Sequence, residues 1–144
     1  MHKFSFKTFF FVSVILLGFA SMSCSNGTQS QATEQSTKTY SNVSVIDLNE
    51  VVEGGNDVII LDVRTPSEVS EGYVKNAQNL DINGSTFKQQ AEQLDKSKTV
   101  YVYCRSGHRS QIASKTLIEM GFNDVRNVEG GFLAWADKGY QIVK

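Results

Sequence analysis

Beyond residue 42, the apolar positions of the chain follow two alternating patterns. Val58–Leu61 and Thr99–Tyr103 are short, mostly apolar runs rich in β-branched and aromatic residues, and such runs predict strands buried on both faces. Apolar residues elsewhere recur at helical spacing, as Ala113 and Leu117 do. Strands that alternate with helices predict an α/β fold, with a mostly parallel sheet flanked by helices on both faces. We expect one such domain over residues 42–144.

Polar residues mark where the predicted helices begin. Thr65, Pro66 and Glu68 supply an N-cap, a first-turn proline and a capping-box acid in the correct order. Asp47 and Glu50 stand three positions apart in the same way, and they predict the start of an earlier helix. Glycines predict where these helices end, at Gly54-Gly55 and at Gly72.

Weaker patterns predict the remaining elements. We expect a strand over 77–80, a helix over 85–94, a strand over 124–128 and a terminal helix that ends at Gly139. Helical spacing gives each of these helices one buried face, formed by Phe87, Ala91 and Leu94 in the first and by Phe132, Trp135 and Ala136 in the second.

The N-terminus has the pattern of a secretory signal peptide. Lys3 and Lys7 precede an apolar run, Phe9–Ala20, that ends in small residues. This run is too short for a membrane span, which needs about 20 apolar residues. We therefore expect residues 1–23 to be a signal peptide.

Cys24 follows the small-residue site directly, so the site looks like a bacterial lipobox in which the cysteine carries lipid. Lipoboxes usually have Leu where this chain has Ser21, so simple cleavage to a soluble periplasmic protein stays open as the alternative. Residues 24–41 are then a lipid-attachment cysteine and a polar, flexible tether. The expected location is the cell envelope, anchored by lipid to a bacterial membrane.

Composition excludes several function classes. The chain has 144 residues, of which 40% are hydrophobic and 20% charged, and this is ordinary for one globular domain. Its formal net charge of −1 gives no indication of nucleic-acid binding. If Cys24 is acylated, Cys104 is the remaining thiol, which argues against a disulfide or a dithiol redox site. His2 and His108 are too few to build a His/Cys metal cluster, and we expect no metal or cofactor.

The loop Cys104-Arg-Ser-Gly-His-Arg-Ser110 carries the most specific chemistry. It joins the end of a predicted strand to the start of a predicted helix, where unpaired backbone N–H groups and the helix dipole favour negative charge. Gly107 allows a tight curl, and Arg105 and Arg109 favour the thiolate of Cys104. Such settings lower a cysteine pKa from ~8.5 to about 3.5–7.5. A buried structural cysteine is the alternative, but it needs no such loop, so we expect Cys104 to be a catalytic nucleophile.

The other loop residues are candidates for binding an anionic substrate. They are Arg105, Ser106, Gly107, His108 and Arg109. Three of them have simpler interpretations: Arg105 as a solvated loop residue, His108 as an exposed one, and Arg109 as a helix-start residue paired with a carboxylate such as Asp62. Asp62 and Arg64, at the end of the neighbouring strand, are expected to support the loop, and Trp135 is expected in the core.

Two further stretches accompany the loop 104–110: Leu61–Glu68, with Gly72 and Ala77–Asn79 after it, and Asn127–Trp135. Together the three stretches resemble the rhodanese-like domain of single-domain sulfurtransferases. One departure is Gly72–Ala77, which reads Gly-Tyr-Val-Lys-Asn-Ala where family members often read Gly-His-Ile-x-Gly-Ala. Related phosphatases need an Arg six positions after the cysteine, whereas this chain has Ser110 there. The resemblance therefore implies a cradle for sulfur rather than for phosphate.

The resemblance implies a thiosulfate sulfurtransferase. Cys104 would take a sulfane sulfur from a small anionic donor such as thiosulfate, hold it as a persulfide, and pass it to cyanide or a thiol. A persulfide carrier or sulfur-binding module that serves a protein partner at the envelope stays open as an alternative. A phosphatase or an arsenate-reducing relative is the least favoured.

Overall fold

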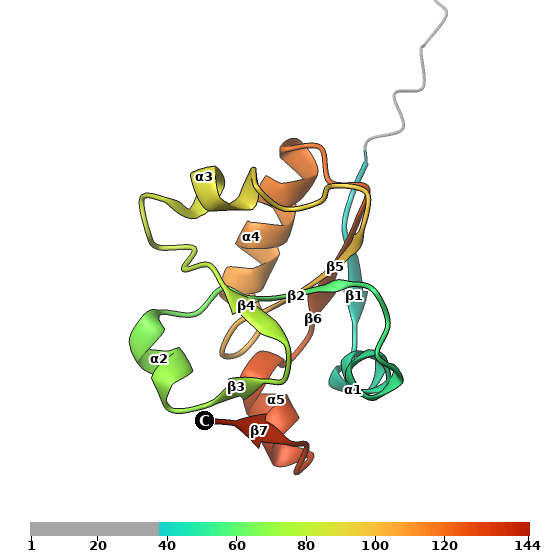
Figure 1. Ribbon diagram of the computed structural model, residues 1–144, viewed down its shortest axis with the longest axis vertical. Coiled ribbons are helices and arrows are strands. Elements are labelled where there is room, and N and C mark those ends of the chain that lie inside the picture. Colours follow the sequence, from blue (N-terminus) through green and yellow to red (C-terminus); the bar gives the residue numbers. More distant parts are fainter. Residues whose placement is uncertain (1–37) are drawn as a thin grey trace, which may run out of the picture. The chain divides into compact units, whose positions relative to one another are not determined.

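The computed structural model describes residues 38–144, which contain a five-stranded sheet with the strand order β1-β6-β5-β2-β4 (Figure 1). Every pairing within this sheet is parallel. Its strands, in spatial order, are β1 (Ser41–Val43), β6 (Asp124–Val128), β5 (Thr99–Tyr103), β2 (Ile59–Asp62) and β4 (Ala77–Asn79). A separate antiparallel pair joins β3 (Tyr73–Val74) to β7 (Ile142–Val143).

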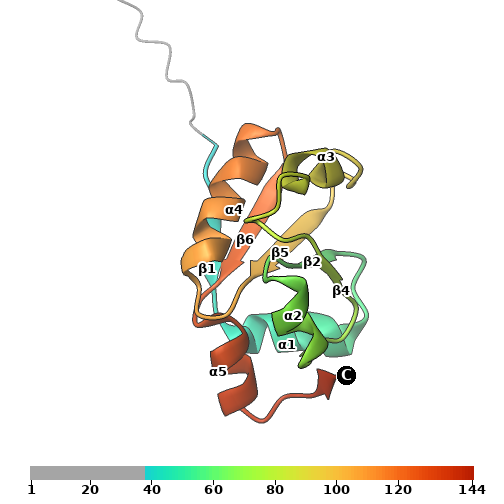
Figure 2. The same cartoon turned by 90° about the vertical axis from the view of Figure 1, so that its left-hand side faces the viewer.

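Helices cover both faces of the sheet. They are α1 (Val45–Gly54), α2 (Pro66–Ser70), α3 (Phe87–Ala91), α4 (His108–Glu119) and α5 (Gly131–Asp137). Figures 1 and 2 show α3 and α4 on one side of the sheet and α1 and α5 on the other. Two clusters of buried side chains fill these two interfaces. The predicted α/β fold, a mostly parallel sheet between helical layers, is confirmed.

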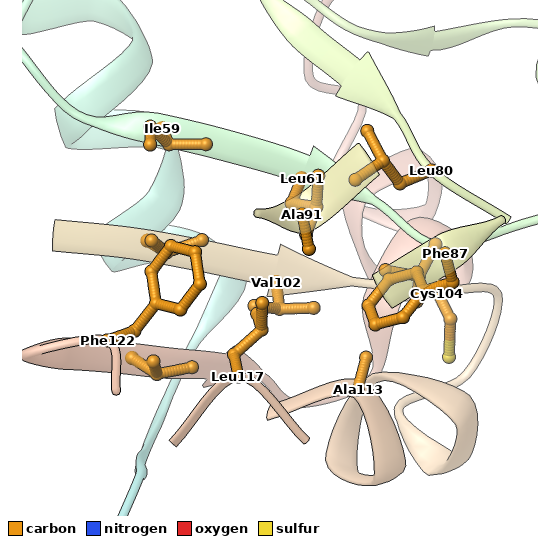
Figure 3. Close-up of a cluster of buried hydrophobic side chains, with 13 residues drawn as sticks. Ile59, Leu61, Leu80, Phe87, Ala91, Val102, Cys104, Ala113, Leu117 and Phe122 are labelled. Carbon is orange, nitrogen blue, oxygen red and sulfur yellow. The ribbon is translucent and has the colours of Figure 1, made fainter. Parts of the chain in front are cut away.

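Strand β5 lies in the middle of the sheet and contributes to both clusters. Val100 and Val102 point to the α3/α4 side, while Tyr101 and Tyr103 point to the α1/α5 side, as the two-residue period of a strand requires. Cys104 continues the first series and joins the α3/α4 cluster (Figure 3). The strand period thus directs this sulfur toward the start of α4.

The helix starts agree with the sequence at α2 and differ at α1. Thr65 caps α2 and forms a capping box with Glu68, as predicted. In α1 the N-cap is Ser44, and Asp47 is its capping-box acid, so the prediction of Asp47 as cap was wrong. The reason is that β1 ends at Val43 through its pairing with β6, which places Ser44 at the junction.

Other differences concern short or marginal elements. The helix expected over 85–94 is limited to α3, although Phe87 and Ala91 are buried as predicted. Trp135 lies in the core as predicted, whereas Ala136 is exposed because it falls on the outer side of α5. The short strands β1, β3 and β7 were not predicted, since two or three residues show no reliable period.

Several predictions fall on residues 1–37 and lie outside the described residues: the signal peptide 1–23, the lipid-attachment residue Cys24 and most of the tether. The end of that tether needs a correction, because Ser41 belongs to β1 and Tyr40 packs against the core. Over the described residues, none of the helices has the length and hydrophobicity needed to cross a membrane.

Candidate active site

The carboxyl ends of β2 and β5 lie side by side, and Asp62 is paired in register with Tyr103. Arg64 follows β2, is 2% exposed, and donates from Nε and Nη2 to the Asp62 carboxylate at 2.6–3.0 Å. Its Nη2 also donates to the Gly72 carbonyl at 2.8 Å, and its guanidinium lies 3.9 Å from the ring centroid of Phe132. This buried pair therefore ties β2 to the segment after α2 and to α5. Support of the loop 104–110 by Asp62 and Arg64 stays a prediction, because these contacts reach residues outside that loop.

The loop from Cys104 to Ser110 wraps around the sulfur. Cys104 is 1% exposed, and the backbone N–H of Gly107 donates to its Sγ at 3.1 Å. Gly107 has a φ of 104°, which a residue with a side chain adopts only with strain. The Ser110 hydroxyl and the Gln111 N–H both donate to the Gly107 carbonyl, at 2.9 and 3.2 Å. The Gly107 carbonyl thus points toward α4, while the Gly107 N–H points toward the sulfur of Cys104.

Helix α5 holds the outer side of the same loop. The N–H of Phe132 donates to the Cys104 carbonyl at 2.8 Å, and that of Leu133 donates to the Arg105 carbonyl at 3.0 Å. A Cβ on Gly131 would lie 2.3 Å from the Cys104 carbonyl oxygen, so this close approach requires glycine. The Gly-Gly pair at 130–131 is visible in the sequence. The need for glycine at 131, however, depends on a contact with Cys104, which is distant in the sequence.

These contacts stabilise negative charge on the sulfur. Burial raises the pKa of Cys104, but the nearby Ser110 hydroxyl and the backbone groups of Ser110, Gly107 and Ser106 outweigh it, so the pKa lies below its ordinary value. Of these groups, the Gly107 N–H makes the hydrogen bond to Sγ. The thiolate is the nucleophilic form of cysteine. Ser110 was noted in the sequence only as a position without Arg, and its contribution to the sulfur was missed.

Arg109 binds a carboxylate rather than facing solvent. Its Nη1 and Nη2 donate to Oε2 and Oε1 of Glu68, both at 2.7 Å. One interpretation of Arg109 from the sequence was pairing with a carboxylate such as Asp62. The partner is Glu68, because Arg64 occupies Asp62. The Arg109 hydrogen bonds lower the pKa of Glu68 to about 2. Glu68 was predicted only as a capping acid, and its place at the site was missed.

Two hollows flank the loop. One, of about 340 Å³, is lined by Ser106, Gly107 and His108 with residues of the β6–α5 connection. The other, of about 380 Å³, is lined by Arg105 together with residues of α2 and α5. Arg105, Ser106 and His108 are exposed, while Arg109 is half-buried. The structure therefore gathers the five predicted binding residues around Cys104, with Arg109 engaged by Glu68.

Among residues 38–144, no three His, Cys, Asp or Glu side chains converge to form a metal site. The reactive and charged groups at this edge of the sheet are the Cys104 sulfur, the loop amides and the guanidinium groups of Arg105 and Arg109.

A family model for the rhodanese-like domain matches residues 44–138. The chain belongs to the rhodanese-like family. It is 34% identical over 96 residues to a sulfurtransferase of Allochromatium vinosum, a match that covers 67% of this chain and 88% of that protein. It is equally identical over 96 residues to the thiosulfate sulfurtransferase GlpE of Coxiella burnetii, covering 67% of this chain and 87% of GlpE.

The fold of this rhodanese-like chain is also found in solved structures. A rhodanese-related protein of Thermoplasma volcanium superposes with a TM-score of 0.64 at 34% sequence identity, over 72% of this chain and 98% of the other. The three sequence stretches that carry the resemblance come together in space. Residues 61–68 supply Arg64 and Glu68, residues 104–110 surround the sulfur, and residues 127–135 hold the loop from outside.

Proposed function

We propose that the protein is a thiosulfate sulfurtransferase in which Cys104 carries the transferred sulfur. The observation that supports this most directly is the hydrogen bond from the Gly107 N–H to Cys104 Sγ, within a loop that lowers the pKa of this thiol. A sulfur held in this way has more thiolate character at neutral pH than an ordinary cysteine. The relatives named as sulfurtransferases support the same reaction class.

The proposed reaction has two displacement steps. The Cys104 thiolate attacks the outer sulfur of thiosulfate, a new S–S bond forms, and the bond to the sulfonate group breaks with its electron pair leaving on sulfite. Cyanide or a thiolate then attacks the terminal sulfur and takes it, and the bonding pair returns to Cys104. Neither step requires a net proton transfer. Loop amides oriented toward the sulfur stabilise its charge in each state.

The exposed loop side chains contribute to binding the donor in this proposal. Arg105 is exposed beside the 380 Å³ hollow and attracts the anionic sulfonate. Ser106 and His108 lie at the other hollow and can donate hydrogen bonds to donor oxygens. Because Cys104 is 1% exposed, the donor reaches the sulfur only when exposed parts of the loop move aside.

The experiment is a thiosulfate:cyanide assay on the purified full chain, combined with intact-mass measurement. After thiosulfate treatment we expect a gain of one sulfur atom, about 32 Da, on Cys104. Cys104→Ser should abolish both turnover and the adduct, while Cys24→Ser is the matched control and should retain both. Persistent turnover in Cys104→Ser would rule the mechanism out.

The burial of Cys104 favours a second candidate, a persulfide carrier that is unloaded by a protein partner. A carrier would show the sulfur adduct after thiosulfate treatment but no multiple turnover with cyanide or small thiols. The same two measurements therefore distinguish the carrier from the enzyme.

We also propose an envelope location, from the signal pattern in residues 1–23 and the lipobox-like position of Cys24. A labelled fatty acid should be incorporated into the wild-type protein and not into Cys24→Ala. Wild-type protein that stays unlabelled, yet is exported, would indicate the soluble periplasmic form.

A further inference from the structure

The ion pair of Glu68 and Arg109 joins α2 to the first turn of α4, 41 positions apart in the sequence. Both carboxylate oxygens and both terminal guanidinium nitrogens take part, each at 2.7 Å. The pair is half-buried, with side chains 24% exposed in Arg109 and 27% in Glu68. This is the parallel, two-bond arrangement in which arginine binds carboxylates and tetrahedral oxyanions alike.

The carboxylate of Glu68 is also held in place from its own helix. Its Oε2 accepts hydrogen bonds from the N–H and the hydroxyl of Thr65, at 3.1 and 3.0 Å, as the acid of the capping box. The α2 cap therefore orients the carboxylate toward Arg109 independently of the loop. A group that is oriented in advance loses little conformational entropy when it binds, so it competes strongly with a free anion.

Arg109 is the loop arginine placed to bind a phosphate at Cys104, because its charge acts on the sulfur as well as on Glu68. Glu68 makes the larger contribution to the raised pKa of Arg109, and Cys104 makes a smaller one. With Glu68 bound, its fork of donors is occupied and its charge is balanced. Any oxyanion that used Arg109 would first have to displace a fixed carboxylate. The Gly107 N–H that donates to the sulfur takes no part in this pairing.

We propose that Glu68 is a specificity-determining residue that, by occupying Arg109, prevents this arginine from clamping phosphate or arsenate, whereas the sulfonate of thiosulfate is bound by Arg105. The inference rests on the proposed sulfur transfer and deepens it: a thiophilic donor needs the thiolate and the loop amides, whereas a phosphate monoester needs the guanidinium fork. Glu68 thus favours sulfur donors over phosphoryl compounds at the same cysteine.

The test measures how well inorganic phosphate protects Cys104 from alkylation by iodoacetamide. The variant is Glu68→Gln, because Gln serves in capping boxes as Glu does while it lacks the charge that holds Arg109. The matched control is Glu71→Gln, an exposed carboxylate that lines the same 380 Å³ hollow. Circular dichroism and thermal melting establish that each variant is folded, and Cys24→Ser in every background removes the other cysteine.

We expect phosphate to protect Glu68→Gln at concentrations about tenfold lower than the wild type, the effect of gaining charge-assisted hydrogen bonds. Glu71→Gln should match the wild type. The gain should disappear in the double variant Glu68→Gln/Arg109→Ala. Equal protection in Glu68→Gln and wild type, or the same gain in Glu71→Gln, would overturn the proposal.

A second measurement does not depend on the folding of Glu68→Gln. In the wild-type background, Arg109→Ala should change phosphate protection by less than about twofold, because the arginine fork is already occupied. A large loss of protection would mean that Arg109 binds phosphate in spite of Glu68, and would also overturn the proposal.

Alkylation does not require turnover, so the two ideas fail separately. A wild-type protein with no sulfurtransferase activity but with the expected protection pattern would refute only the proposed function. An active protein in which Glu68→Gln gains no phosphate protection would refute only the role of Glu68.

Discussion

The backbone N–H of Phe132 donates a 2.8 Å hydrogen bond to the carbonyl of Cys104. The first turn of α5 therefore holds the nucleophile's own peptide group, while the loop amides face the side chain. The first turn of α5 thus fixes the position of Cys104, which lies just before α4 in the sequence. Stability of the loop and reactivity of the sulfur should depend on this contact, although the two segments are distant in the sequence.

Replacing Gly131 with Ala should damage both stability and reactivity. The new Cβ would lie 2.3 Å from the Cys104 carbonyl oxygen, at a residue whose φ is 54°. We expect a loss of about 2 kcal/mol or more in the free energy of unfolding, measured by urea denaturation, together with slower alkylation of Cys104. Gly139→Ala is the control, because Gly139 has a φ of 71° but nothing within 4 Å of the added Cβ. Equal effects of the two substitutions would contradict a special role for the α5 contact.

Replacing Arg64 with Lys should lower the free energy of unfolding, although the positive charge is retained. Lysine cannot reproduce the bidentate bonds to Asp62 and the bond to the Gly72 carbonyl, and Asp62 is fully buried. We expect a loss of about 3 kcal/mol or more in the free energy of unfolding. Arg126→Lys is the matched control, because the pair of Arg126 and Asp124 is 37% and 41% exposed; exposed pairs contribute about 1 kcal/mol or less. A similar loss in both variants would argue against the importance of burial.

The reactivity of Cys104 should depend on pH and on Ser110. Alkylation follows the thiolate, so its rate should rise with pH around a midpoint below that of an ordinary cysteine, because the pKa of Cys104 is lowered. Removing the hydroxyl in Ser110→Ala should raise the pKa of Cys104, move the midpoint to higher pH and slow alkylation at neutral pH about threefold or more. The control is Ser106→Ala, which retains the backbone N–H and changes an exposed side chain. An unchanged midpoint in Ser110→Ala would show that backbone groups alone hold the charge.

The ion pair of Glu68 and Arg109 should stabilise the folded chain at neutral pH, and this contribution should be lost at acid pH. The pKa of Glu68 is about 2 in the folded chain, against 4.5 for the ordinary carboxyl group, because Arg109 donates to it. A lowered folded pKa gives stability that is complete above the unfolded value and is lost as pH falls. Wild type should therefore be more stable than Glu68→Gln above pH 4.5, and the difference should shrink between pH 4.5 and about 2. A difference that stays constant across this range would contradict the linkage.

The amino-acid sequence by itself determined the elements whose signals are local. The β-branched runs, the Thr65 capping box and the loop between a strand and a helix all depend on neighbours within a few positions, and the structure contains each of them. The position of Cys104 at the end of a central parallel strand follows from the same patterns. So does the burial of Trp135, which the apolar spacing of the last helix predicted.

The tertiary structure decided how these elements meet. The choice of Glu68 rather than Asp62 as the partner of Arg109 depends on which carboxylate the neighbouring Arg64 occupies. The need for glycine at 131 depends on the distance to the Cys104 carbonyl. Local sequence encodes backbone preference and side-chain period, but a contact across 41 positions depends on the packing of whole elements, which no local window contains.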